Sequence, residues 1–160
     1  MNITLRSYAT EDFDALYAID QACYEPAIAY SKRELRNYLR FPGGDCVIAE
    51  AEVPAKIAGF CMSAHQDARG YIITIDVLAE FRRHGVGTLL LAEIERRLAS
   101  QGVKEIGLET ATDNESAIAF WQKHGYRTRG VWKHYYPGPR DAFAMTKTLA
   151  QSAAASKARP

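Results

Sequence analysis

The chain has 160 residues, with 20 basic and 19 acidic side chains and a formal net charge of +1 at pH 7. This length predicts one domain with a sizeable hydrophobic core. The balanced charge gives no bulk electrostatic reason to bind nucleic acid or a membrane, so we expect neither partner. Three cysteines far apart and four histidines without paired spacing predict neither a disulfide framework nor a metal site.

No apolar run approaches 18 residues, and the first eight residues do not read as a signal peptide. We therefore expect a reduced, cytoplasmic protein.

Apolar and polar residues alternate over residues 3–8, which predicts a first strand, and Thr10 is expected to cap the helix that follows. A capping-box pattern at residues 31–34 predicts a second helix through about Arg40, after an irregular loop over 23–30. The later elements are expected in this order: strands over 46–51, 56–63 and 72–77, a helix from Gly85 to Leu98, a strand over 104–110, a helix over 115–124, and strands over 126–135 and 142–149.

This order of elements predicts an α/β fold, with a mixed central sheet of about seven strands and helices on both faces. We expect a single domain over residues 1–149. The Ala-, Ser- and Lys-rich segment over 150–160 is expected to be a disordered tail.

The segment over residues 82–87 turns from the strand over 72–77 into the long amphipathic helix. The first N–H groups of a helix lack intrahelical partners and lie at the positive end of its dipole. Gly85 and Gly87 keep side chains away from these groups, and Arg82 and Arg83 add positive charge. The turn is therefore predicted to bind a phosphate. It lacks the Lys-Ser or Lys-Thr of a Walker loop and the third glycine of a Rossmann fingerprint.

The pattern Arg-x-x-Gly-x-Gly, following a strand that ends in Val-Leu, resembles the acetyl-CoA signature of the GNAT superfamily of N-acetyltransferases. The order of elements over residues 1–149 is also that of the GNAT fold. Asn114 and residues 117–126 are similar to a further stretch of the GNAT pattern. Tyr135-Tyr136-Pro137 and residues 140–145 resemble one branch in particular, the ribosomal-protein alanine N-terminal acetyltransferases (RimI type).

The resemblance implies acetyl-CoA as the cosubstrate, with its pyrophosphate on the glycine turn, and Glu109 as the general base. In the RimI branch the general acid is a Tyr, but Trp121 stands at that position, and an indole N–H cannot protonate a thiolate. Tyr135 or Tyr136 is the remaining candidate for a hydroxyl donor, and Asp76 is a weaker candidate base. The implied cofactor-binding residues are Val77, Leu78, Arg82, Arg83, His84, Gly85, Val86, Gly87, Thr88, Asn114 and Trp121.

An amine must be neutral to attack a thioester. At pH 7 an α-amine with a pKa of about 7.7–8.0 needs little help, whereas a lysine side chain with a pKa of about 10.4 costs roughly 4–5 kcal/mol to deprotonate. A single carboxylate base therefore favours a protein N-terminal α-amine as the acceptor, attacked directly without an acyl-enzyme.

Two alternatives stay open. The loop over 23–31 and the short Gly138-Pro139 turn depart from the RimI pattern, so the acceptor could instead be a small-molecule amine. Trp121 in place of the acid also permits a largely non-catalytic acetyl-CoA-binding module. The sequence is compatible with a monomer or a homodimer.

Overall fold

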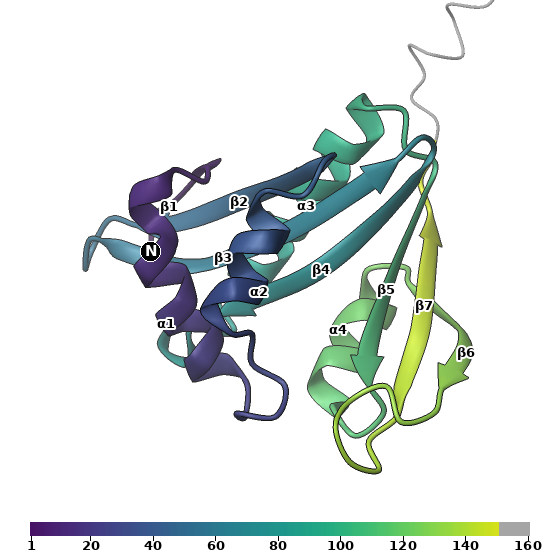
Figure 1. The fold of residues 1–160 in the computed structure, drawn as a ribbon. Coiled ribbons are helices and arrows are strands. Elements are labelled where there is room, and N and C mark those ends of the chain that lie inside the picture. Colours follow the sequence, from purple (N-terminus) through teal and green to yellow (C-terminus); the bar gives the residue numbers. More distant parts are fainter. Residues whose placement is uncertain (151–160) are drawn as a thin grey trace, which may run out of the picture.

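The computed structural model describes residues 1–150, shown as a ribbon in Figure 1. Residues 151–160, which make up nearly all of the expected tail, lie outside the described residues. The predicted order of strands and helices is confirmed. The elements are β1 (Ile3–Ser7), a 3-10 turn (Thr10–Asp12), α1 (Phe13–Cys23), α2 (Lys32–Leu39), β2 (Gly44–Ala51), β3 (Lys56–Gln66), β4 (Arg69–Val77), a second 3-10 turn (Ala79–Phe81), α3 (Val86–Ser100), β5 (Glu105–Ala111), α4 (Glu115–Lys123), β6 (Arg127–Trp132) and β7 (Ala142–Thr148).

Seven strands form one mixed sheet in the order β1-β2-β3-β4-β5-β7-β6. Helices α1 and α2 cover one face and α3 covers the other (Figure 1). Two apolar clusters hold these layers together, one between α3, α4 and the sheet and one under α1 and α2. The predicted α/β architecture, with about seven strands and helices on both faces, is therefore confirmed.

The sheet opens in its middle. β4 and β5 are the parallel pair, and they are hydrogen-bonded only between residues 69–71 and residues 105–107. Beyond that point the two strands diverge, as Figure 1 shows. Ile73 is an extra residue on β4, because Met62 pairs with Thr74 and Ser63 with Ile72. Such a bulge bends a strand and raises its twist, and here it lies where β4 leaves β5.

Two helix starts were predicted from capping patterns, and they differ in outcome. The box at residues 31–34 is confirmed: Glu34 N–H donates to Ser31 Oγ at 3.1 Å, and Ser31 N–H donates to Glu34 Oε1 at 3.0 Å. The cap at Thr10 is wrong. Ala9 is the N-cap residue of the 3-10 turn before α1, and the Asp12 carboxylate accepts its N–H at 2.8 Å. Arg6 on β1 holds the same carboxylate with two hydrogen bonds of 2.8 Å, a long-range contact that no local pattern reveals.

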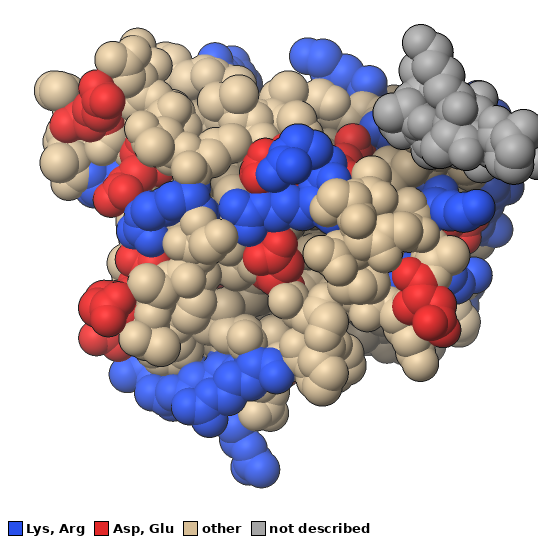
Figure 2. Space-filling model, turned by 90° about the horizontal axis from the view of Figure 1, so that it is seen from above, with Lys and Arg blue, Asp and Glu red and all other residues tan. Residues whose placement is uncertain are grey.

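Charged side chains of both signs are interspersed over the face shown in Figure 2. Within residues 1–150, none of the helices combines the length and the apolar character that a membrane crossing would need.

Candidate active site

The glycine turn joins β4 to α3. Gly85 has φ +78°, in the left-handed region that glycine adopts without strain. The first hydrogen bond into α3 runs from the Leu89 N–H to the Gly85 carbonyl, at 3.0 Å. The N–H groups of Val86, Gly87 and Thr88 precede it and have no partner inside the helix. No acidic side chain occupies this first turn, so the turn presents free donors at the positive end of a dipole.

The basic residues before the turn differ in what they contact. Arg82 folds back along the chain, where its Nε donates to the Val77 carbonyl at 2.9 Å and its Nη2 lies 3.6 Å from Cys23 Sγ. Arg83 and His84 are exposed. Arg82 therefore fixes the end of β4 in this structure, and the phosphate contacts of these three residues remain predictions.

The edge of β4 that faces the opening has no strand partner beyond residue 71. Three alternating carbonyls on this edge accept hydrogen bonds from side chains of residues 23–30 instead. The N–H and C=O of one strand residue point to the same side, so the N–H groups of these residues face the opening too. The bonds run from the Tyr30 hydroxyl to Ile73, from the Tyr24 hydroxyl to Ile75 and from the Cys23 thiol to Val77, each at 3.4 Å. The edge can thus hydrogen-bond an extended ligand lying between β4 and β5.

Glu109 lies on β5, across the opening from this edge. Its Oε1 accepts a hydrogen bond from the Tyr71 hydroxyl on β4 and another, of 3.1 Å, from the Tyr135 hydroxyl in the β6–β7 loop. The Tyr135 ring packs edge-on against Tyr136, with ring centres 4.9 Å apart. The structure therefore brings Tyr135 to the Glu109 carboxylate, with Tyr136 packed against Tyr135, and adds Tyr71, which the sequence analysis missed.

Burial raises the pKa of the Tyr71 hydroxyl, and its hydrogen bond to Glu109 raises that pKa further. Burial also raises the pKa of Tyr135, and it raises the pKa of Tyr136 to about 12. A thiol has a pKa of about 8.5, so these hydroxyls are weaker acids than the leaving group they would protonate. They are suited to orient the Glu109 carboxylate by hydrogen bonding, and the role of proton donor is unfavourable for them.

Asp76, the weaker candidate base, is 1% exposed and lies beneath α1. Its Oδ1 accepts the Thr74 hydroxyl at 2.6 Å, while Oδ2 faces the buried carboxyl of Asp20 without a hydrogen-bond donor among the described residues. Burial and this second carboxyl raise the pKa of Asp76. A group so enclosed cannot contact an acceptor amine, which leaves Glu109 as the candidate base.

Trp121 and Asn114 were both expected to contact the cofactor. Trp121 is 6% exposed and packs edge-on against Phe120 and Tyr126 in the core. We therefore correct the expectation for Trp121, because its ring is enclosed by the core. Phe120 instead lies under the glycine turn, where a Cβ on Gly87 would come within 3.2 Å of its ring. Asn114 Oδ1 accepts the Ala117 N–H at 3.2 Å, so Asn114 is the N-cap of α4.

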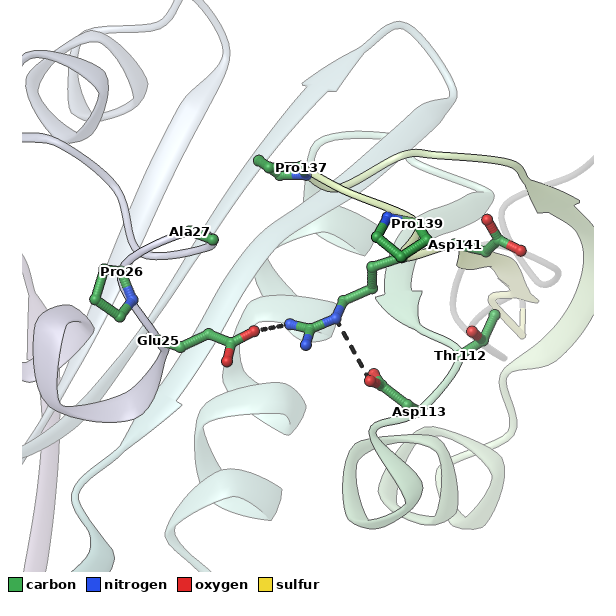
Figure 3. Close-up of a pocket in the computed structure, with 9 residues that line it drawn as sticks. Glu25, Pro26, Ala27, Thr112, Asp113, Pro137, Pro139 and Asp141 are labelled. Carbon is green, nitrogen blue, oxygen red and sulfur yellow. Dashed lines mark hydrogen bonds and ion pairs between the residues drawn. The ribbon is translucent and has the colours of Figure 1, made fainter.

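A cavity of about 720 Å³ opens next to Tyr136, between the α1–α2 loop, the segment after β5 and the β6–β7 loop. Arg140 reaches across it to two other segments. Figure 3 shows Glu25 and Asp113 on opposite sides of the cavity, each with a dashed line that marks its ion pair. The Arg140 guanidinium forms an ion pair with Glu25, and its Nε lies 3.4 Å from Asp113 Oδ2. These three residues come from three segments. Arg140 begins the stretch that resembles the RimI branch, whereas no motif in the sequence singled out Glu25 or Asp113.

The site thus combines a strand edge with free N–H groups, a helix start with free N–H donors beside it and a carboxylate across the opening. The family model described as Acetyltransferase (GNAT) family matches residues 13–126. The chain belongs to the GNAT acetyltransferase family.

Individual proteins that resemble this chain are acetyltransferases too. The [ribosomal protein bS18]-alanine N-acetyltransferase of Escherichia coli (strain K12) is 27% identical over 150 residues, covering 89% of this chain and 95% of that protein. The crystal structure of the ribosomal-protein-S18-alanine N-acetyltransferase from Escherichia coli superposes with a TM-score of 0.84 at 24% identity, covering 94% of this chain and 96% of that one.

An N-alpha-acetyltransferase of Sulfurisphaera tokodaii is 34% identical over 82 residues, about half of each protein, with 51% of this chain and 49% of the relative covered. The crystal structure of the NatC complex bound to Gag peptide and CoA contains a chain with a TM-score of 0.79 at 24% identity, and the match covers 94% of this chain and 100% of that chain. The two structural similarities establish the GNAT fold.

Proposed function

We propose that this acetyltransferase moves an acetyl group from acetyl-CoA to the N-terminal α-amine of a protein or peptide. The observation that carries the proposal is the Glu109 carboxylate, held by two tyrosine hydroxyls across from the free edge of β4. The printed names of the relatives, an N-alpha-acetyltransferase and a ribosomal-protein alanine N-acetyltransferase, support the choice of acceptor.

The chain's own groups fit acetyl-CoA. The N–H donors at the start of α3 would bind its pyrophosphate, and the N–H groups on the free edge of β4 would bind the amides of its extended arm. The absence of a side chain at Gly87 lets the Phe120 ring pack closely against this turn, since a Cβ there would lie 3.2 Å from the ring.

The reaction then needs one proton transfer from the acceptor. The neutral amine nitrogen attacks the thioester carbon, the C–N bond forms, and the C–S bond breaks with its electron pair leaving on sulfur. Glu109 takes the proton that the amine loses. Tyr71 and Tyr135 donate to one oxygen of this carboxylate, which leaves the other oxygen available for the amine, directly or through one water.

The test is mass spectrometry of an Ala-initiated peptide with an internal lysine, incubated with acetyl-CoA and the protein. We expect one acetyl group, mapped to the α-amine. Acetylation of the lysine alone, or of small amines but no peptide, would overturn the proposed acceptor.

Glu109→Gln tests the base separately. The amide oxygen of glutamine can still accept both tyrosine hydroxyls, so the fold should persist while kcat falls by roughly 10²-fold or more. The stabilisation by acetyl-CoA should remain. Glu105→Gln is the matched control, since residue 105 lies on the same strand with the same side-chain direction and, among residues 1–150, forms an ion pair only with the exposed Arg69. Full activity of Glu109→Gln would exclude Glu109 as the base.

A further inference from the structure

The cavity bridged by Arg140 has an uneven charge balance. Arg140, with a side chain 30% exposed, is shared between Glu25 and Asp113, whose side chains are 50% and 64% exposed. One guanidinium thus faces two carboxylates, and each carboxylate has lone pairs that remain open to a further donor. The other acid of the cavity, Asp141, is already held by Lys133 at 3.3 Å and by the His134 N–H at 2.9 Å.

The cavity lies at a defined distance from the candidate base. Its wall includes Thr112, three residues beyond Glu109 along β5 and its end, which corresponds to about 10 Å at 3.3 Å per residue. In an extended peptide the second Cα lies about 5 Å from the α-amine. A lysine or arginine side chain extends several ångströms further, so a peptide whose amine meets Glu109 can place its second side chain in the cavity.

The wall of the cavity is also hydrogen-bonded to the loop whose Tyr135 contacts Glu109. The Tyr136 N–H donates to the Arg140 carbonyl at 3.1 Å, and the neighbouring Tyr135 donates to Glu109. A peptide seated at Glu109 therefore passes the loop that carries Arg140.

We infer that Arg140, with Glu25 and Asp113, determines specificity for the second residue of the acceptor and selects a cationic side chain there. The inference rests on the proposed function, because it presumes a peptide acceptor at Glu109. A lysine or arginine binds the open lone pairs of Glu25 and Asp113. An acidic side chain meets two carboxylates, and Arg140, the cation between them, is already engaged by both.

The experiment compares three peptides that begin with Ala and differ only at the second residue, which is Lys, Gln or Glu. For the unmodified protein we expect kcat/KM to fall in that order, by roughly threefold to tenfold at each step at low salt. The ratio between the Lys and Glu peptides should shrink as salt is added, since these side chains are partly exposed.

Two variants move the preference in opposite directions. Arg140→Gln removes the cation and leaves both carboxylates open, so the preference for Lys over Glu should increase. The double variant Glu25→Gln with Asp113→Asn leaves Arg140 without these partners, so the preference should invert toward Glu. Glu52→Gln, an acid at the far end of the sheet that contacts Asn2, should leave the ratio unchanged.

The outcomes separate the two proposals. Equal kcat/KM for the three peptides, or one unchanged ratio in all variants, overturns the inference about the second residue and leaves the proposed acetyl transfer intact. Failure of the unmodified protein to acetylate any of the peptides overturns the proposed function itself. A variant with a lowered Tm is judged on the ratio between peptides, which a general loss of folded protein does not change.

Discussion

Replacing Asp76 by asparagine should stabilise the protein at neutral pH. Asp76 and Asp20 are 1% and 0% exposed, and Asp76 Oδ2 and Asp20 Oδ1 have no hydrogen-bond partner among the described residues. Burial is the largest cause that raises the pKa of both carboxyls. An asparagine can keep the bond from Thr74 with its oxygen and turn its NH₂ group toward Asp20. The variant thus has an NH₂ group that donates a hydrogen bond at every pH, where the aspartate can donate one only while it is protonated.

The size of the effect follows from the cost of the proton. Keeping an aspartate of ordinary pKa, about 3.9, protonated at pH 7 costs about 4 kcal/mol at 1.36 kcal/mol per pH unit. This is the upper limit of the gain. If the asparagine amide forms its hydrogen bond to Asp20 with imperfect geometry, the free energy of unfolding should rise by about 1–3 kcal/mol. At about 2–4 °C per kcal/mol for a chain of this size, the Tm should rise by roughly 2–12 °C.

The gain has a definite pH dependence. Because the folded-state pKa values are raised, the contribution of the protonated pair to stability is fully present below the ordinary aspartate pKa and is lost as pH rises toward the raised values. Urea unfolding at pH 4, 6 and 8 should therefore show little difference between Asp76→Asn and the unmodified protein at pH 4 and an increasing advantage above it. Asp14→Asn, an exposed position on α1, is the control.

Destabilisation of Asp76→Asn at pH 8, or a gain equal at all three pH values, would refute this account of the pair. The consequence extends to the site, because Asp20 Oδ2 accepts the Tyr30 N–H at 2.7 Å and so holds the loop that caps the edge of β4.

Two further changes test the turn and the second helix. Gly87→Glu should abolish the rise in Tm caused by acetyl-CoA, because it places a carboxylate at the free N–H groups of α3, whereas Gly130→Glu on exposed β6, where a Cβ has open space, should not. Unchanged acetyl-CoA binding by Gly87→Glu would contradict the phosphate assignment. Ser31→Ala should lower the stability of the protein by about 1 kcal/mol through loss of the helix cap, and Ser31→Thr should retain most of it. An unaltered Tm of the alanine variant would show that the 3.1 Å bond to the Glu34 N–H contributes little.

Features set by neighbouring residues were predictable from the sequence. The capping box at residues 31–34 and the glycine turn at residues 85–87 depend on a few adjacent positions, and both have the expected geometry. The order of strands and helices followed from periodicity for the same reason. Thr10 shows the limit, since Ala9 is the N-cap residue and the Asp12 carboxylate that accepts its N–H is bound by Arg6.

The site itself depends on contacts between distant segments. Tyr71 meets Glu109 only because β4 and β5 pair for three residues and then separate, and nothing in either strand marks that point. Trp121 shows the same limit, because only the packing of α4 decided that its ring faces the core.

The sequence by itself thus determined the elements, their order and the glycine turn before α3. These features rest on backbone propensity and on residues a few positions apart. Only the tertiary structure decided which tyrosines contact Glu109, that Asp76 is buried against a second carboxyl, and that Arg140 joins Glu25 across a cavity. Those contacts arise where two strands diverge and where two loops meet. Glu25 and Arg140, for example, are 115 residues apart in the sequence.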